Sequence, residues 1–201
     1  MTHPIQALRD VHRSRNDRGA VAVFVALTMV IVLAAAAFSI DTTTLAMRRA
    51  TLQDTLDSAA QIGASLLPDN PEEALASAAR YLTKTDPTIT PDIRLWCVVS
   101  GIDAEVITTQ IPGECDPGTG PYTANVNGVR CGPNMCAIPC PSSGVCNALS
   151  VQASATVEFY FAPAIGVSNH STGPLTAASC IGACGEESAT TSGTVFIKLP
   201  T

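Results

Sequence analysis

The sequence predicts an α+β protein. A long N-terminal membrane-spanning helix continues as an amphipathic helix that packs on a small antiparallel sheet, and a disulfide-rich loop joins the strands. Three observations lead to this fold class. An uncharged stretch of 21 residues runs from Ala20 to Ile40. Apolar residues then recur at helical spacing over 42–67, and alternating segments rich in β-branched residues begin near residue 93. Five of the eight cysteines fall within 112–146.

Composition narrows the class of protein before any motif is considered. The 201 residues are 46% hydrophobic but only 14% charged, against about 25% charged in ordinary soluble proteins. This balance disfavours a compact cytosolic enzyme, and it excludes a disordered chain, which needs low hydrophobicity. The net charge of −6 argues against binding to nucleic acid, because phosphate neutralisation requires a clustered basic face.

The apolar stretch 20–40 is predicted to span a membrane, within a segment assigned to 19–41. As a helix it is about 31 Å long, which matches the hydrocarbon core of a bilayer. A buried core helix rarely stays apolar for more than about 14 residues. A cleaved signal peptide is the closer alternative, but its apolar region is about 7–15 residues long. We therefore expect the span to be retained.

The charges on either side of the span predict its orientation. Residues 1–18 carry four arginines and two aspartates, a net charge of +2, whereas residues 41–201 carry 7 basic and 15 acidic groups, a net charge of −8. Basic residues beside a first span stay on the cytoplasmic side. The expected arrangement is a single-pass protein of the cell membrane, with a cytoplasmic tail at 1–18 and an extracytoplasmic domain at 42–201.

Two helices are expected after the span. The first covers 42–67, with a possible bend at Thr42–Thr44, because three consecutive β-branched residues have low helix propensity. Pro68 ends it. The second covers 71–84, with Asn70 as its N-cap and Pro71 at the first helical position.

The rest of the chain is predicted to form strands and an irregular loop. Strands are expected at 93–99, 104–110, 149–161 and 193–199. The loop 112–146 contains twelve glycine or proline residues among its 35, so it cannot be regular structure throughout.

The cysteines are interpreted as disulfide-bonded. Five lie inside the loop, namely Cys115, Cys131, Cys136, Cys140 and Cys146, and three lie outside it, namely Cys97, Cys180 and Cys184. Because five is odd, complete pairing requires at least one bond from the loop to the outside, and Cys97 is the favoured anchor if Cys180 and Cys184 pair locally. A zinc site is the alternative, but the outward topology favours disulfides. Spacing alone does not choose the connectivity.

No catalytic motif is present in the sequence. It lacks the nucleophile elbow G-x-S-x-G, the zinc motif H-E-x-x-H, the Walker phosphate loop and the dinucleotide fingerprint. We therefore expect no catalytic residues, no cofactor and no metal, and we do not expect an enzyme.

Two stretches carry a resemblance to a known family. The first begins at the span and extends into the next helix; its positions are Arg18, Gly19, Asp41, Arg48, Arg49, Leu52, Gln53, Asp57 and Gly63. The second is VQASATVEFYFAPAIG at 151–166. Together they resemble the TadE/TadG-like family of tight-adherence (Flp-type) pilus assembly. The cysteine loop is not part of that family pattern.

The resemblance implies a membrane-anchored accessory component of a pilus or secretion assembly. Its implied partners are membrane lipid, other pilus-assembly or pilin-like membrane proteins, and further copies of the chain through the membrane helix. The small residues Ala22, Ala26 and Ala34–Ala37 would permit close approach of helices.

Two other functions stay open at this point. The chain could be a minor pilin-like subunit that joins a filament after cleavage at Gly19. However, processed pilin-like members carry Glu five residues after the cleavage glycine, where this chain has Phe24. The chain could also be an extracellular adhesive module that binds through the cysteine loop.

Overall fold

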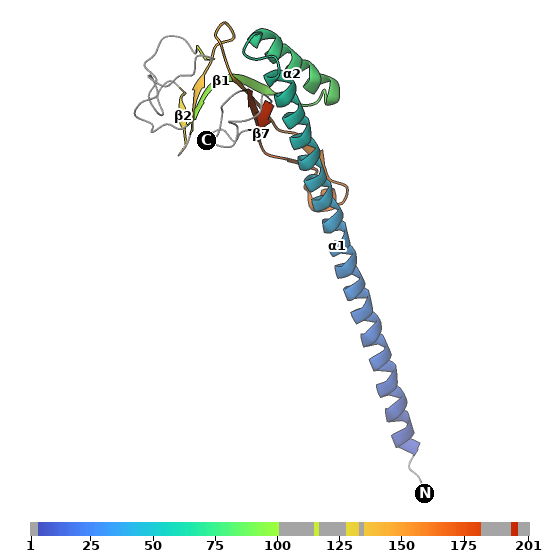
Figure 1. Ribbon diagram of the computed structural model, residues 1–201. Helices are drawn as coiled ribbons and strands as arrows, with labels where there is room; N and C mark the ends of the chain where they lie inside the picture. Colours follow the sequence, from blue (N-terminus) through green and yellow to red (C-terminus); the bar gives the residue numbers. More distant parts are fainter. Residues whose placement is uncertain (1–3, 101–114, 117–127, 133–134, 182–193, 197–201) are drawn as a thin grey trace. The chain divides into compact units, whose positions relative to one another are not determined.

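The computed structural model describes residues 4–100, 115–116, 128–132, 135–181 and 194–196 (Figure 1). The chain divides into two units, one made of Met1–Leu45 with Glu158–His170, the other of Ala46–Val157 with Ser171–Thr201. The predicted α+β class is confirmed, because a long apolar helix, a second helix and an antiparallel sheet are all present.

The first helix, α1, runs from Pro4 to Ala64 and includes the apolar stretch and most of the expected amphipathic helix. It ends three residues before the predicted boundary at residue 67. The chain then leaves the helix through short turns, in which the N–H groups of Leu66 and Leu67 donate to the carbonyl oxygens of Gly63 and Ala64.

The expected bend at Thr42–Thr44 is not present, since α1 is regular α-helix through these residues. Each threonine hydroxyl donates to a backbone carbonyl one turn earlier: Thr43 to Ser39 at 2.8 Å, Thr42 to Phe38 and Thr44 to Ile40 at 3.0 Å each. These bonds accommodate the β-branched side chains within the helix.

The second helix, α2, covers Pro71–Thr85, which confirms the predicted segment. Asn70 occupies the N-cap position but makes no side-chain capping bond. Its backbone carbonyl accepts the first helical hydrogen bond, from the N–H of Ala74. Glu72 and Glu73 lie in the first turn, where carboxylates complement the helix dipole.

The main sheet has six strands in the order β2-β3-β1-β4-β7-β8, all paired antiparallel. The bounds are β1 Asp92–Ser100, β2 Arg130–Cys131, β3 Met135–Pro139, β4 Ala148–Ala153, β7 Leu175–Ile181 and β8 Thr194–Phe196. A separate two-stranded sheet joins β5 Thr156–Glu158 and β6 Asn169–Ser171. A short 3-10 helix, η2, covers Ala162–Ile165.

Several strand predictions need correction. The single strand expected at 149–161 is divided into β4 and β5, and residues 154–155 and 159–161 belong to neither. Strand β7 was not predicted, and β3 lies inside the loop that was expected to be irregular. The strand expected at 104–110 lies outside the described residues.

The core lies between the C-terminal part of α1, from Leu52 onward, helix α2 and one face of the sheet (Figure 1). Its fully buried members include Leu56 from α1, Leu82 from α2 and Leu149 from β4. Along β1 the same face continues from Leu95 to Cys97 and Val99, which belong to a second buried cluster containing cysteines. This second cluster extends the core along the sheet with Cys97, Cys115 and Cys136, whereas Cys140 and Cys146 belong to the cluster that packs with the helices.

Candidate functional site

The apolar section of α1, residues 20–40, is the first candidate functional surface. Its large side chains are exposed all around the helix; for example, Phe24 is 70% and Ile31 66% exposed. Its one threonine, Thr28, donates its hydroxyl to the carbonyl of Val25. Among the described residues, one helix is long and apolar enough to cross a membrane, and it is this section of α1 with its continuation.

Asp41 follows directly after this section and is almost completely buried, with 4% of its surface exposed. Its carboxylate accepts hydrogen bonds from three consecutive backbone N–H groups, those of Tyr160 (2.9 Å), Phe161 (3.1 Å to Oδ2) and Ala162 (2.8 Å). Ala162 is the first residue of η2 and Phe161 its N-cap. Asp41 therefore occupies an anion site formed by the start of a helical turn.

This contact brings together the two stretches that carried the family resemblance. Asp41 belongs to the first stretch, and Tyr160 to Ala162 belong to the second. Tyr160 to Ala162 lie in a loop at 159–168. This loop is closed at its base by the N–H of Phe159, which donates to the carbonyl of Ser168 at 3.1 Å. The Phe159 ring also stacks on His170, with centroids 6.2 Å apart.

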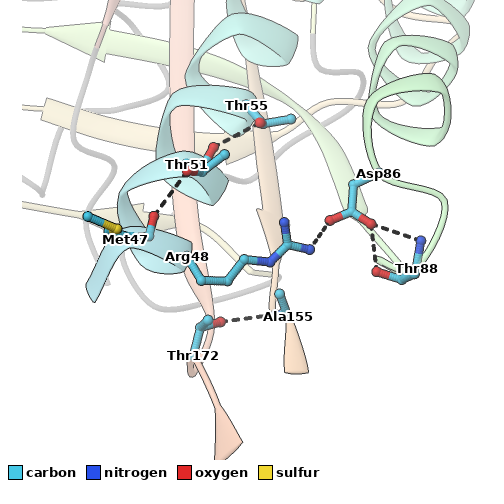
Figure 2. Close-up of polar contacts among 8 residues, drawn as sticks. All are labelled: Met47, Arg48, Thr51, Thr55, Asp86, Thr88, Ala155 and Thr172. Atoms are coloured by element: carbon cyan, nitrogen blue, oxygen red, sulfur yellow. Dashed lines mark hydrogen bonds and ion pairs between the residues drawn. The ribbon is translucent and has the colours of Figure 1, made fainter. Parts of the chain in front are cut away.

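Arg48 lies further along α1 and pairs with Asp86 at the C-terminal end of α2 (Figure 2). The Thr88 hydroxyl donates to Asp86 Oδ1 at 2.6 Å, and the Thr88 N–H donates to the same oxygen at 3.0 Å. The Thr88 hydroxyl, together with the Thr88 N–H and the Arg48 guanidinium, holds the pKa of Asp86 below its ordinary value, although burial acts in the opposite direction.

Arg49, the second residue of the basic pair, binds a different segment. Its Nε donates to the carbonyl of Thr172 at 2.8 Å. Thr172 is itself fully buried, and its hydroxyl accepts from the N–H of Ala155 (Figure 2). One turn later, Gln53 donates to Asp57 at 2.9 Å and more weakly to the carbonyl of Thr176.

Leu52 and Gly63 pack α1 against its neighbours. Leu52 is buried in the core shared with α2 and the sheet. A Cβ atom at Gly63 would lie 2.7 Å from Leu149 Cδ1 and 3.1 Å from the carbonyl oxygen of Ala74. Only glycine allows α1, α2 and β4 to approach this closely.

The other two resemblance positions, Arg18 and Gly19, lie further toward the N-terminus of α1. Gly19 lies in α1 with open space where its Cβ would be, and Arg18 lies in the same helix. Each resemblance position from Asp41 onward thus makes a hydrogen bond, an ion pair or a packing contact, and that of Asp57 stays within α1.

Three cysteine pairs form disulfides: Cys97–Cys115, Cys131–Cys136 and Cys140–Cys146. The first connects strand β1 to the loop, the connection that an odd number of loop cysteines requires. Cys180 is also disulfide-bonded, and Cys184 lies outside the described residues. Within the described part of the chain, no group of three potential metal ligands is present.

A pocket of about 370 Å³ opens beside β1 and β3; it is lined in part by Arg94, Trp96, Arg130 and Pro139. The Arg130 guanidinium lies over the Trp96 ring, 5.3 Å from its centroid. Among the described residues that line it, none is a histidine or a carboxylate, the usual residues for general acid–base chemistry.

The family resemblance points to Asp41, Arg48 and Arg49 but not to their partners. Thr88 and Thr172 carried no recognisable signal. Asp86 carried a weak one, because an aspartate that ends a helix two residues before a threonine can accept from the Thr88 N–H in a local turn. No protein-family model, curated protein or solved structure matches this chain.

Proposed function

We propose that the chain is a membrane-anchored accessory component of a Tad/Flp-type pilus or secretion assembly, with a structural and interacting role and no catalytic one. The observation that carries the anchoring part is the section of α1 at 20–40, whose apolar side chains are exposed on every side. Burying one such side chain contributes about 1.5–3 kcal/mol, and packing against one face of a protein would leave most of them in water. A bilayer surrounds the helix completely.

The extracytoplasmic position of the domain is supported by its disulfides. The three described pairs connect residues between Cys97 and Cys146, and such bonds persist in oxidising compartments. With the positively charged tail at 1–18, this favours a cytoplasmic N-terminus.

The role in an assembly rests on the resemblance and on what its positions do here. Asp41, Arg48 and Arg49 are used in contacts within the chain, so they hold the protein's own parts together. Contacts with partners are then expected on the span, where Ala22, Ala26 and Ala34–Ala37 allow close helix approach.

Membrane insertion can be tested by placing a charge in the middle of the span. Val30→Lys should lower the fraction of the chain that stays in the membrane after alkaline extraction, because a lysine at the centre of a span costs about 2.5–3.5 kcal/mol. Val30→Leu is the matched control and should stay in the membrane fraction. Equal retention of both variants would contradict the anchoring role.

The assembly role needs a separate measurement in the native host. Deleting the chain should reduce the number of surface pili or the amount of secreted substrate. The wild-type chain should restore it, and the Val30→Lys variant should not. Unchanged piliation and secretion in the deletion strain would contradict the assembly role and leave anchoring intact.

The same exposed apolar helix also favours the second candidate, a pilin-like subunit, because such a helix can pack against copies of itself in a filament. Mass spectrometry of the mature N-terminus separates the two. A chain that begins at Ala20 would support processing and would contradict the retained anchor.

A further inference from the structure

The loop at 159–168 carries an unusual set of exposed side chains. Tyr160 is 76% exposed, Phe161 48% and Val167 43%. No residue from Phe159 to His170 is acidic or basic apart from the histidine. Exposed aromatic and aliphatic side chains gathered in a loop that has no acidic, lysine or arginine side chain of its own mark a contact surface.

Asp41 determines where this loop lies along α1. Its three hydrogen bonds hold the backbone at Tyr160, Phe161 and Ala162 against the helix, at the first residue after the apolar section. A helical side chain points toward the N-terminus of its helix and covers the preceding turn. The loop is thus held beside the last turn of the apolar section.

The exposure of neighbouring residues on α1 agrees with this position. Between Ala20 and Ile40 all residues are exposed except Ala37, which is half-buried and lies one turn before Asp41. Thr44 and Leu45, one turn after Asp41, are half-buried as well. These residues share one face of the helix, because they are separated by three or four positions.

The environment of Asp41 removes the main objection to placing this loop near lipid. A bare carboxylate at the edge of an apolar helix would have to be desolvated. Here the carboxylate is 4% exposed and accepts from three N–H groups. The hydrogen bonds also satisfy the N–H groups at the start of η2, so the loop presents side chains, and not unpaired N–H groups, to its surroundings.

We propose that the loop 159–168 lies in the interfacial region of the bilayer, where Tyr160 and Phe161 enter the boundary between headgroups and acyl chains at the C-terminal end of the span. This inference rests on the proposed membrane anchoring. Its occupant is lipid, because the loop continues the apolar surface of the span and because aromatic side chains favour this boundary. Asp41 then fixes both the loop and the depth of the helix.

The test places a tryptophan in the loop and measures its depth. The full chain carrying Phe161→Trp is reconstituted into phosphatidylcholine vesicles whose acyl chains are brominated either near the headgroup or near the methyl end. The buried native Trp96 supplies a background, which the unmodified chain measures. Ser143→Trp, at an exposed position of the other unit, is the control.

We expect the added fluorescence at residue 161 to be lost mainly with bromine near the headgroup, and the fluorescence at residue 143 to be lost only to aqueous iodide. Iodide quenching at 161 without bromine quenching would overturn the proposal. So would protection from both quenchers, which would indicate a protein partner or a second copy, and so would equal bromine quenching at 143.

Vesicle flotation separates this inference from the function on which it rests. If the chain floats with the vesicles but bromine does not quench residue 161, the interfacial position of the loop is wrong and membrane anchoring still holds. A chain that does not float with the vesicles would overturn both.

Discussion

Two sections of α1 have opposite surroundings although they belong to the same helix. At 20–40 the residues are apolar on all sides, and every one except Ala37 is exposed. At 52–64 the apolar residues lie mainly on one face, where Leu52, Leu56 and Ala60 are buried in the core, and Ile62 is exposed. The first section has no polar face to turn toward water, whereas the second has one.

The difference shows that burial follows the pattern of the sequence and not the amount of apolar surface. An amphipathic helix is satisfied by a neighbour on one side, here α2 and the sheet. A uniformly apolar helix needs an apolar environment all around it. The change from one pattern to the other takes place around Asp41, Arg48 and Arg49, whose polar contacts hold the loop at 159–168, α2 and the segment at Thr172.

The largest effect on stability is expected when leucine is replaced by alanine in the packed section, and the same replacement in the apolar section serves as its comparison. Leu56→Ala should lower the unfolding free energy of the disulfide-containing domain by about 2–5 kcal/mol, because Leu56 is fully buried. Leu33→Ala removes the same atoms from an exposed site and should leave the melting temperature of that domain unchanged. Thermal unfolding of both variants in detergent micelles measures the two effects. Equal losses of stability would show that the two sections of α1 do not differ in their contribution to the fold.

A smaller, local effect is expected at the boundary between the two sections. Asp41→Ala leaves the N–H groups of Tyr160, Phe161 and Ala162 without their acceptor, which should weaken the loop by about 1–3 kcal/mol. Hydrogen exchange at these amides should then be faster by about tenfold for every 1.4 kcal/mol lost.

Asp41→Asn keeps the side-chain shape and one acceptor oxygen, so it should have an intermediate effect. Asp54→Ala, at an exposed position of the same helix, serves as the control and should not change exchange at residues 160–162. Unaltered exchange in Asp41→Ala would show that the loop is held by other contacts.

The sequence was sufficient where the determining signal is local. The 21 uncharged residues predict the apolar section of α1, and Pro71 with its two following glutamates predicts the start of α2. Strand β7 was missed because Leu175–Ile181 contains few β-branched residues. Its conformation is set by pairing with β4 over the register from Ala148–Cys180 to Ala153–Leu175.

Only part of the candidate site could be predicted, because the partners of its charged residues lie far away in the sequence. Asp41 was marked by its place at the end of the span, but its three donors lie 119 to 121 residues away. Arg49 reaches Thr172 over 123 residues. Backbone donors and acceptors carry no side-chain signature, so only the folded arrangement identifies which of them a charged side chain will bind.

The smallest effect concerns the pair that connects the packed section of α1 to α2. The Thr88 hydroxyl and the Arg48 guanidinium favour the ionised form of Asp86, so the pKa of its carboxyl is lower in the folded chain than in the unfolded chain. The stabilisation is therefore complete above the ordinary value of 3.8 and is lost as the pH falls through the lower, folded value. Asp86→Asn should remove this pH-dependent contribution, which is about 1 kcal/mol for a pair that solvent still reaches through the arginine. Urea unfolding of both proteins between about pH 3 and pH 6 should give curves that lie furthest apart at the upper end and converge toward the acidic end. Curves that stay parallel over the whole range would mean that Asp86 titrates alike in the folded and unfolded chains. The connection between α1 and α2 would then rest on apolar packing alone.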